Sequence, residues 1–266
     1  MLRIITVASI LLLLGACATM TDISPAVRSD LAPTGTLRAG INHGNTVLAQ
    51  RDPASGELRG VAVDLTRELG RRVGVPVQLI PYGTAGSMTD AVGSGAWDIA
   101  FLAAEPGRAG EIAFTAPYLL IEGTYLVPPG APFQRGEDVD RPGVRIAVAS
   151  KSAYELFLTR NIQHAELVRS ASGDAGLDLV VAGKADVLAG VRQLLVATAP
   201  RLAGSRVMED RFMTINQAMG MPKGRDAGLA YARAFIEDVK ASGFVARALE
   251  RSGQGNVPVA PPAPAR

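Results

Sequence analysis

The sequence predicts an α/β protein whose folded part consists of two α/β units. Short alternating or apolar stretches, typical of strands, are followed by stretches with helical spacing, and this alternation favours a layered α/β fold. The same alternation restarts after the proline-rich break at 128–132. Each series has roughly a hundred residues, which is a common size for one domain.

The first series begins at residue 36, and its last predicted strand ends at residue 103. Alternating residues and short apolar runs predict its strands, and apolar residues that recur on one helix face predict its helices. In chain order the predicted elements are a strand over 36–42, a helix with Leu65, Leu69 and Val73 on one face, a strand over 77–82, a short helix over 88–92 and a buried strand over 99–103.

The second series begins with an alternating strand and is followed by two closing helices. Ser172 has the residue type that favours a helix N-cap, and Pro200 ends the helix before it. In chain order the predicted elements are a strand over 144–148, a helix over 152–160, a strand over 164–169, a helix over 172–182, a strand over 186–189, a helix over 192–199, a long helix over 225–240 and a last helix that ends at Arg251.

Residues 1–18 have the pattern of a secretory signal. Arg3 precedes an apolar stretch that is too short to span a bilayer as a stable helix, and small residues follow it. The segment 14–17 resembles a bacterial lipobox, which makes Cys17 the predicted site of lipidation. Ordinary cleavage within 16–18 is the alternative. Cys17 is the only cysteine, so the chain forms no internal disulfide.

Two segments flank the predicted fold. Residues 19–34 contain two prolines, and we expect them to be a spacer between the anchor and the first strand. Proline recurs within residues 253–266, and because it interrupts both helices and sheets we expect a disordered tail there.

Composition excludes several classes of function. The formal net charge is +2, aromatic residues make up 5%, and no long basic run is present, so nucleic-acid binding has no support. Beyond the signal, no stretch is apolar for long enough to cross a membrane. His43 and His164 have no metal-ligand spacing with cysteines or carboxylates, so we expect neither a metal nor a cofactor.

The most specific motif ends at Arg108. The strand predicted over 99–103 is followed by Pro106 and Gly107, a turn signal that places Arg108 just beyond the carboxyl end of the strand. Small ligands bind at this edge of open α/β sheets. A guanidinium held there presents a fixed fork of donors that suits a carboxylate or a phosphate.

Residues 95–108 and 113–118 resemble the "D…TPER…FS.PY" signature of the family 3 solute-binding proteins, the periplasmic receptors of polar amino acid uptake systems. Residues 35–40 and 60–65 look like the opening strand and the first helix start of that family, and 146–152 look like the turn that opens its second lobe. The resemblance covers nearly all of residues 35–252.

This resemblance implies a two-lobed, type II periplasmic-binding-protein (Venus-flytrap) fold whose hinge is crossed twice. The implied crossings lie near 122–128 and 212–217. Residues 35–123 and 216–252 would form lobe one, and residues 128–211 would form lobe two. From the residue pattern alone, two domains in tandem fit equally well.

The resemblance also implies a set of ligand contacts. Arg108 would hold the carboxylate of the ligand, and Ser152 would donate its hydroxyl and its backbone N–H to the same group from the second lobe. A helix N-terminus at Ser152 suits an anion because its N–H groups are free, and Ser152 is equally suited to be the N-cap. Ala103 and Asn42, at the ends of two strands, complete the expected contacts.

Departures from the family pattern leave the ligand open. Lys151 replaces a glycine and adds a cation beside the second-lobe turn. Gly190 stands where amino acid binders of the family have the aspartate that pairs with the ammonium group of the ligand. Either Glu105 or Glu122 supplies the missing negative charge, or the ligand is a carboxylate without an amine.

The sequence therefore predicts a monomeric extracytoplasmic receptor that captures a small carboxylate-bearing solute, an amino acid or a related organic acid. It would deliver the solute to an ABC permease in the inner membrane and be anchored only by its lipid. One alternative is a dehydratase-like enzyme on the same scaffold, in which Glu105 acts as a general acid with a raised pKa. The other alternative is a lipid-anchored sensory protein.

Overall fold

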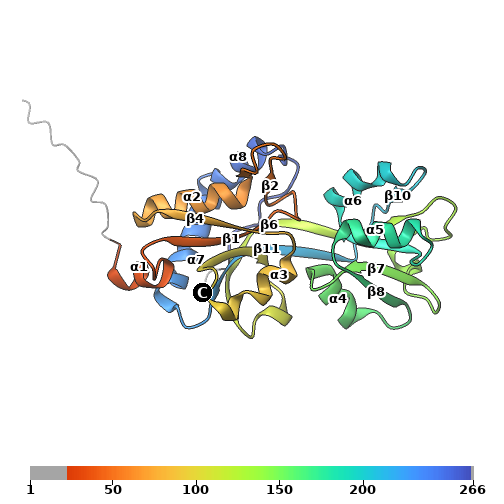
Figure 1. The fold of residues 1–266 in the computed structure, drawn as a ribbon, viewed down its shortest axis with the longest axis horizontal. Helices are drawn as coiled ribbons and strands as arrows, with labels where there is room; N and C mark the ends of the chain where they lie inside the picture. The colour runs from red at the N-terminus through yellow and green to blue at the C-terminus, as the bar shows by residue number, and fades with distance from the viewer. Residues whose placement is uncertain (1–22, 265–266) are drawn as a thin grey trace, which may run out of the picture.

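The structure, a computed structural model, describes residues 23–264. The predicted signal and the predicted lipidation at Cys17 lie outside these residues. One continuous path of hydrogen-bonded strands runs through both halves of the molecule, in the order β4–β1–β5–β11–β6–β9–β7–β8 (Figure 1). Strand β10 also pairs with β6, and β2 and β3 form a separate two-stranded ladder.

The strands are β1 (Leu37–Asn42), β2 (Gln50–Arg51), β3 (Leu58–Arg59), β4 (Val77–Tyr82), β5 (Ile99–Ala103), β6 (Ile112–Val127), β7 (Arg145–Ala149), β8 (Glu166–Ser170), β9 (Val187–Val191), β10 (Arg206–Val207) and β11 (Met213–Pro222). The helices are α1 (Pro25–Leu31), α2 (Val61–Val73), α3 (Ala85–Asp90), α4 (Ala153–Asn161), α5 (Gly173–Val181), α6 (Arg192–Thr198), α7 (Asp226–Ala241) and α8 (Phe244–Arg251). Four short 3₁₀ helices are η1 (Val92–Ser94), η2 (Pro106–Arg108), η3 (Gly136–Asp138) and η4 (Ala199–Arg201).

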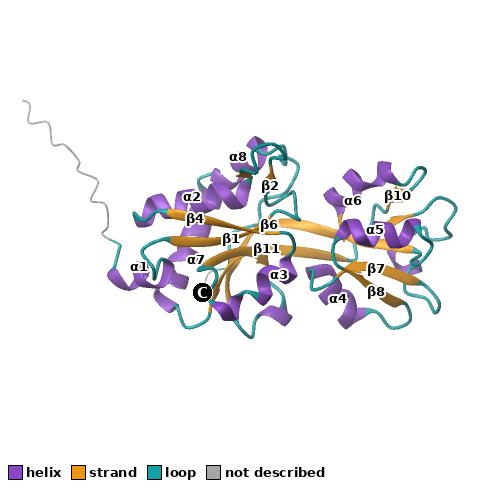
Figure 2. Cartoon of the chain, in the orientation of Figure 1, coloured by secondary structure: helices purple, strands orange, loops and turns teal. Residues whose placement is uncertain are grey.

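The molecule has two lobes, each with helices packed around its part of the sheet (Figure 2). In lobe one, β1 pairs in parallel with β4 and β5, and every residue of β5 is buried. Helices α2, α7 and α8 contribute to the large apolar core of this lobe. In lobe two, β7 pairs in parallel with β8 and β9, and α4 and α5 pack against them. The predicted α/β, two-lobed fold is confirmed.

Two long antiparallel strands, β6 and β11, connect the lobes. Strand β6 pairs with β11 as far as Gly123 and with β9 from Gly123 onward. Gly123 pairs with Met213, so both strands pass from one lobe to the other at this level. A Cβ at Gly123 would lie 2.8 Å from side-chain atoms of Phe212 and Met213, so the close approach of the two strands requires glycine here.

The structure corrects the expectation that residues 19–34 are a spacer, for the residues 23–34 that it describes. Residues 25–31 form α1, which begins with a hydrogen bond from the Val27 N–H to the Ser24 hydroxyl. Leu31 is fully buried, and the Asp30 carboxylate accepts a hydrogen bond from the Gly228 N–H in α7. Because α1 buries an apolar residue against lobe one, this segment belongs to the fold.

The expected disorder of residues 253–266 is corrected in the same way for residues 253–264. Val257 and Ala260 are buried in lobe one, and Val259 forms an antiparallel bridge with Leu119 in β6. Prolines are tolerated here because the segment adds one short bridge to the outside of β6 and forms no ladder of its own.

Removal of residues 257–266 should lower the free energy of unfolding by about 1.5–3 kcal/mol, the value of one buried valine side chain. Chemical denaturation followed by circular dichroism would measure the loss. A shorter truncation that ends at Pro261 keeps both buried residues and serves as the control. Equal stability of the full chain and the longer truncation would contradict the packing role of this segment.

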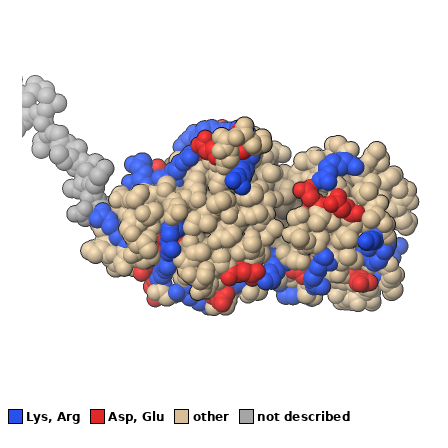
Figure 3. Space-filling view, in the orientation of Figure 1, with Lys and Arg blue, Asp and Glu red and all other residues tan. Residues whose placement is uncertain are grey.

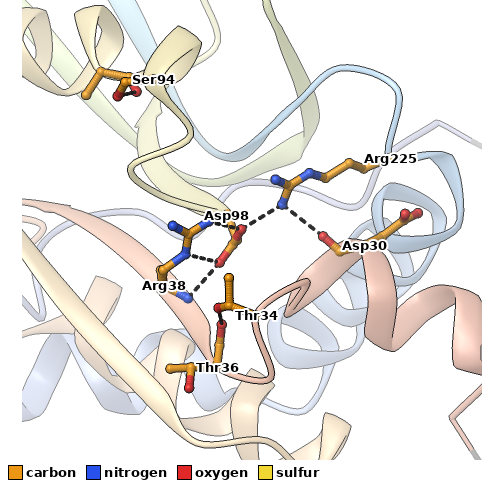
Figure 4. Close-up of polar contacts among 8 residues, drawn as sticks. Asp30, Thr34, Thr36, Arg38, Ser94, Asp98 and Arg225 are labelled. Atoms are coloured by element: carbon orange, nitrogen blue, oxygen red, sulfur yellow. Dashed lines mark hydrogen bonds and ion pairs between the residues drawn. The ribbon is translucent and has the colours of Figure 1, made fainter.

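A buried carboxylate, Asp98, joins three elements of lobe one (Figure 4). Arg38 in β1 donates to it from Nε at 2.9 Å, from Nη2 at 2.8 Å and from its backbone N–H at 3.1 Å. Arg225, the residue before α7, donates from Nη1 to Asp98 at 2.9 Å and to the Asp30 carbonyl at 3.0 Å. This cluster fixes α1 and the start of α7 against the sheet.

Lobe two repeats part of this arrangement. Arg145, at the start of β7, donates to Asp186, the residue before β9, from its backbone N–H at 2.7 Å and from Nη2 at 2.8 Å. The two aspartates differ in exposure, because the Asp98 side chain is 0% exposed and the Asp186 side chain is 34% exposed. Outside these clusters, the face of the molecule in Figure 3 carries charges of both signs on both lobes.

Candidate functional site

A cavity of about 500 Å³ lies between the lobes and receives side chains from both. Lobe one contributes the segments that follow β1, β4 and β5, and lobe two contributes the starts of α4 and α5 and the region from β9 to α6. Strand β11 adds Ile215 and Gln217. The carboxyl ends of the parallel strands therefore face this space, as expected for a ligand site in an α/β protein.

Arg108 is the buried cation of the cavity. It ends the 3₁₀ helix η2 directly after β5, and the residue is 3% exposed. Nη1 donates to the Ala103 carbonyl at 2.9 Å, and Nη2 donates across the lobes to the Lys151 carbonyl at 2.9 Å. Nε is buried and has no hydrogen-bond partner.

The electrostatic environment of Arg108 lacks a paired anion. Burial lowers the pKa of Arg108 to about 10, although the negative charge of Glu105 acts in the opposite direction. The guanidinium is therefore still charged at pH 7. A buried charge without a hydrogen-bonded counter-ion is costly, so the site favours an anionic ligand.

Three of the helices that begin at the cavity wall have a hydroxyl N-cap. Thr84, Ser152 and Ser172 accept hydrogen bonds from backbone N–H groups of α3, α4 and α5 at 3.1, 3.1 and 3.2 Å. The first turn of a helix has N–H groups without partners inside the helix and carries partial positive charge. These helix starts therefore add to the positive potential around Arg108.

The family model of the bacterial extracellular solute-binding proteins, family 3, matches residues 37–254 of the chain. The chain belongs to this family. The predicted family is thus confirmed, and the solute-binding protein is extracytoplasmic by family. No curated protein matches the sequence.

Solved structures of similar proteins share the fold of this solute-binding protein. An ancestral amino acid-binding protein, described as a precursor of cyclohexadienyl dehydratase, is 22% identical with a TM-score of 0.70 and covers 84% of this chain and 97% of its own. A receptor for L-cysteine from Neisseria gonorrhoeae is 20% identical with a TM-score of 0.73, and the match covers 85% of this chain and 92% of that chain. An amino acid ABC transporter substrate-binding protein from Streptococcus pneumoniae, solved with L-arginine, is 16% identical with a TM-score of 0.72, and the match covers 86% of this chain and 98% of that chain.

Five of the residues named as ligand contacts from the sequence line the cavity of the solute-binding protein: Asn42, Ala103, Arg108, Ser152 and Gly190. The expected backbone contact from Ser152 is not free, because its N–H donates to the Ala149 carbonyl at 3.2 Å. The Ser152 hydroxyl accepts the Glu155 N–H of its own helix at 3.1 Å, and the Tyr154 side chain forms a hydrogen bond with it. The Asn42 Oδ1 accepts the Gly44 N–H at 3.1 Å, which leaves its amide group as the donor.

Neither Glu105 nor Glu122 lines the cavity, and this corrects the expectation that one of them supplies its negative charge. Glu105 is buried and accepts a hydrogen bond from Arg160 of lobe two at 2.7 Å. Glu122 accepts from Arg192 at 2.6 Å and from Arg211 at 2.8 Å. The bonds from the two arginines hold the pKa of Glu122 below its usual value. Both carboxylates are therefore neutralised by arginines outside the ligand space.

Lys151 also does not line the cavity, so its expected ligand contact is corrected as well. Its Nζ bonds both carboxylate oxygens of Asp90 in lobe one, at 2.7 and 2.8 Å. Its backbone adopts a φ of +57°, which lysine rarely adopts and glycine adopts freely. Lys151 thus combines an interlobe ion pair with a strained backbone.

A pair of substitutions separates these two properties of Lys151. Lys151→Ala removes the ion pair and keeps the strain, whereas Lys151→Gly removes both. We expect Lys151→Gly to be more stable than Lys151→Ala by about 1 kcal/mol, because glycine has no Cβ in the left-handed region. Thermal and chemical unfolding of the two variants would measure the difference, and equal stability would show that the backbone here is unstrained.

Two further cavity residues, Gln217 and Asp174, escaped the sequence analysis. Gln217 in β11 is 4% exposed, and its Oε1 is buried without a hydrogen-bond partner. Asp174, in the first turn of α5, lies at the cavity with its side chain 75% exposed and paired with Arg201. No short motif marks Gln217, because β11 reaches the cavity only through its pairing with β5.

Among residues 23–264, no helix is both long and apolar enough to cross a membrane. The same part of the chain contains no group of three or more histidine, cysteine, aspartate or glutamate residues arranged to hold a metal ion.

Proposed function

We propose that this protein is a receptor that captures a small carboxylate-bearing solute between its lobes and delivers it to an ABC-type permease. The observation that carries the proposal is the Arg108 guanidinium, which is buried, charged and without a counter-ion in the cavity. A ligand carboxylate supplies that counter-ion and accepts the remaining donors of the fork. The amino acids named for the solved relatives carry such a carboxylate, which supports this ligand class.

Closure of the lobes follows from the same contacts. Arg108 belongs to lobe one and Ser152 to lobe two, and Arg108 already donates to the Lys151 carbonyl across the gap. A ligand held by Arg108 and by the start of α4 contacts both lobes only when they are closed. It therefore shifts the hinge equilibrium toward the closed form that a permease recognises.

The remaining parts of the proposal concern location and assembly. We propose that Cys17 carries a lipid anchor that holds the receptor at a membrane, and that the receptor acts as a monomer. Helix α1 lies at the end of lobe one that is far from lobe two (Figure 1), whereas the cavity lies between the lobes.

Matched acid and carboxamide pairs test the proposed ligand class. Each pair has the same carbon skeleton, and only the acid carries a negative charge. We expect acids to raise the melting temperature of the protein and their carboxamides to leave it unchanged. Equal stabilisation by acid and carboxamide would contradict the proposal, because Arg108 would then contribute no recognition of charge.

A further inference from the structure

We infer that the cavity selects a carboxylic acid with an uncharged hydrogen-bond donor beside the carboxylate, such as a 2-hydroxy acid, in preference to an α-amino acid. This inference rests on the proposed function and specifies its ligand class. It follows from the charges that line the cavity and from one buried acceptor, Gln217.

The charge of the cavity wall opposes an ammonium group. Arg108 is its buried cation, and Asp174 is the one carboxylate among its described lining residues. Asp174 is largely exposed and already bonded by Arg201. Burial, with a further contribution from Arg51, lowers the pKa of His43, so this lining residue is neutral at pH 7. An ammonium next to the ligand carboxylate would meet Arg108 and the positive helix starts, with no buried carboxylate to compensate.

The side-chain oxygen of Gln217 favours a hydrogen-bond donor next to the ligand carboxylate. Gln217 is the register partner of Ala103, and the Ala103 carbonyl accepts the hydrogen bond from Arg108 Nη1. Gln217 and Arg108 therefore both lie at the carboxyl end of β5, and both line the cavity. Gln217 Oε1 accepts no hydrogen bond, and a buried acceptor left unsatisfied is costly. A hydroxyl on the carbon next to the carboxylate satisfies it without adding charge.

Part of the wall is suited to an apolar body. Apolar residues from both lobes line the cavity together with hydroxyl and amide residues, and they are Leu102, Leu188, Leu194, Leu195 and Ile215. The position of Gly190 in β9 adds no charge, and a Cβ there would lie 2.9 Å from the Leu195 side chain. The ligand is therefore expected to have a short aliphatic or aromatic side chain.

Sets of four compounds test the inference, and within each set the side chain is the same. The four members are the 2-hydroxy acid, the α-amino acid, the unsubstituted acid and the 2-hydroxy carboxamide. Side chains from methyl to benzyl cover the size of the cavity, and calorimetry measures affinity. We expect the hydroxy acid to bind tightest. The unsubstituted acid should bind roughly 3–10-fold more weakly, because one neutral hydrogen bond is lost, and the amino acid at least about 10-fold more weakly.

Two variants assign the preference to its source. Gln217→Leu should abolish the discrimination between the hydroxy acid and the unsubstituted acid, while discrimination against the carboxamide persists through Arg108. Gln217→Met serves the same purpose if the leucine variant melts at a lower temperature. A hydroxy-acid preference that is unchanged in both variants would overturn the role of Gln217.

The outcomes separate this inference from the proposed function. If the amino acid binds tightest and the carboxamide does not bind, the receptor proposal stands and the inference is wrong. Loss of that amino acid affinity in Asp174→Asn would identify Asp174 as the partner of the ammonium group and would likewise overturn the inference. If no acid of the panel binds more tightly than its carboxamide, both the inference and the proposed function are wrong.

Discussion

Replacement of Arg108 by alanine should weaken binding of the carboxylate ligand by about 2–5 kcal/mol, because it removes the buried partner of an anion. Arg108 is 3% exposed, so the alanine variant leaves a buried ligand carboxylate without its charged partner. Its loss also removes the hydrogen bond to the Lys151 carbonyl, which joins the two lobes. Calorimetry with the acid identified from the matched pairs would measure the change.

Arg108→Lys and Arg135→Ala provide the comparison for this result. Lysine keeps the positive charge but loses the planar fork, so it should recover only part of the affinity. Arg135 is an exposed arginine outside the cavity, and its replacement should leave binding unchanged. A loss of less than about tenfold, or 1.4 kcal/mol, in Arg108→Ala would show that the carboxylate is held elsewhere.

Much of the binding geometry is predictable from local sequence. Arg108 follows a buried apolar strand and a Pro-Gly turn, and those two signals alone place it at the carboxyl edge of the sheet. Ser152 and Ser172 are predictable as N-caps because hydroxyl residues at helix starts satisfy free N–H groups. In each case the decisive interaction lies within a few residues of the signal.

The unpredicted features depend on contacts between distant residues. Glu105 and Glu122 have the residue type expected of ligand contacts, but arginines at positions 160, 192 and 211 bind them. Strand β6 contains Pro117 and Gly123, which obscure a regular alternation, and β11 enters the cavity only because it pairs between β5 and β6. A local pattern carries no information on which distant side chain arrives as a partner.

The packed ends of the chain illustrate the same limit. Proline predicts that residues 253–264 avoid regular structure, and they do, but an irregular segment can still bury Val257 and Ala260. Likewise, Pro25 begins α1, a position in which proline is well tolerated. Composition is thus compatible with the observed backbone of both segments, but it carries no information about the surface against which they pack.

Replacement of Asp98 by alanine should destabilise the protein by about 3–5 kcal/mol, because it leaves two partly buried guanidiniums without their shared partner. Arg38 and Arg225 both bond this carboxylate, which is 0% exposed. Asp186→Ala is the matched control, since Asp186 bonds Arg145 in the equivalent place of lobe two but is 34% exposed. Its loss should cost less, because water can solvate Arg145. Equal losses in the two variants, measured by chemical denaturation, would show that burial of Asp98 adds nothing.

The same carboxylate should contribute to acid unfolding. Burial alone would raise the pKa of Asp98, but the hydrogen bonds from Arg38 and Arg225 outweigh it and hold the pKa below its usual value. A carboxyl group with a lowered pKa in the folded state stabilises the protein above its unfolded pKa, near 3.9. That contribution is lost as the pH falls toward the folded pKa. The stability difference between the wild type and Asp98→Asn should therefore be constant from about pH 6 to 8 and shrink below about pH 4. A difference that grew as the pH fell would show that the native pKa of Asp98 lies above its unfolded value.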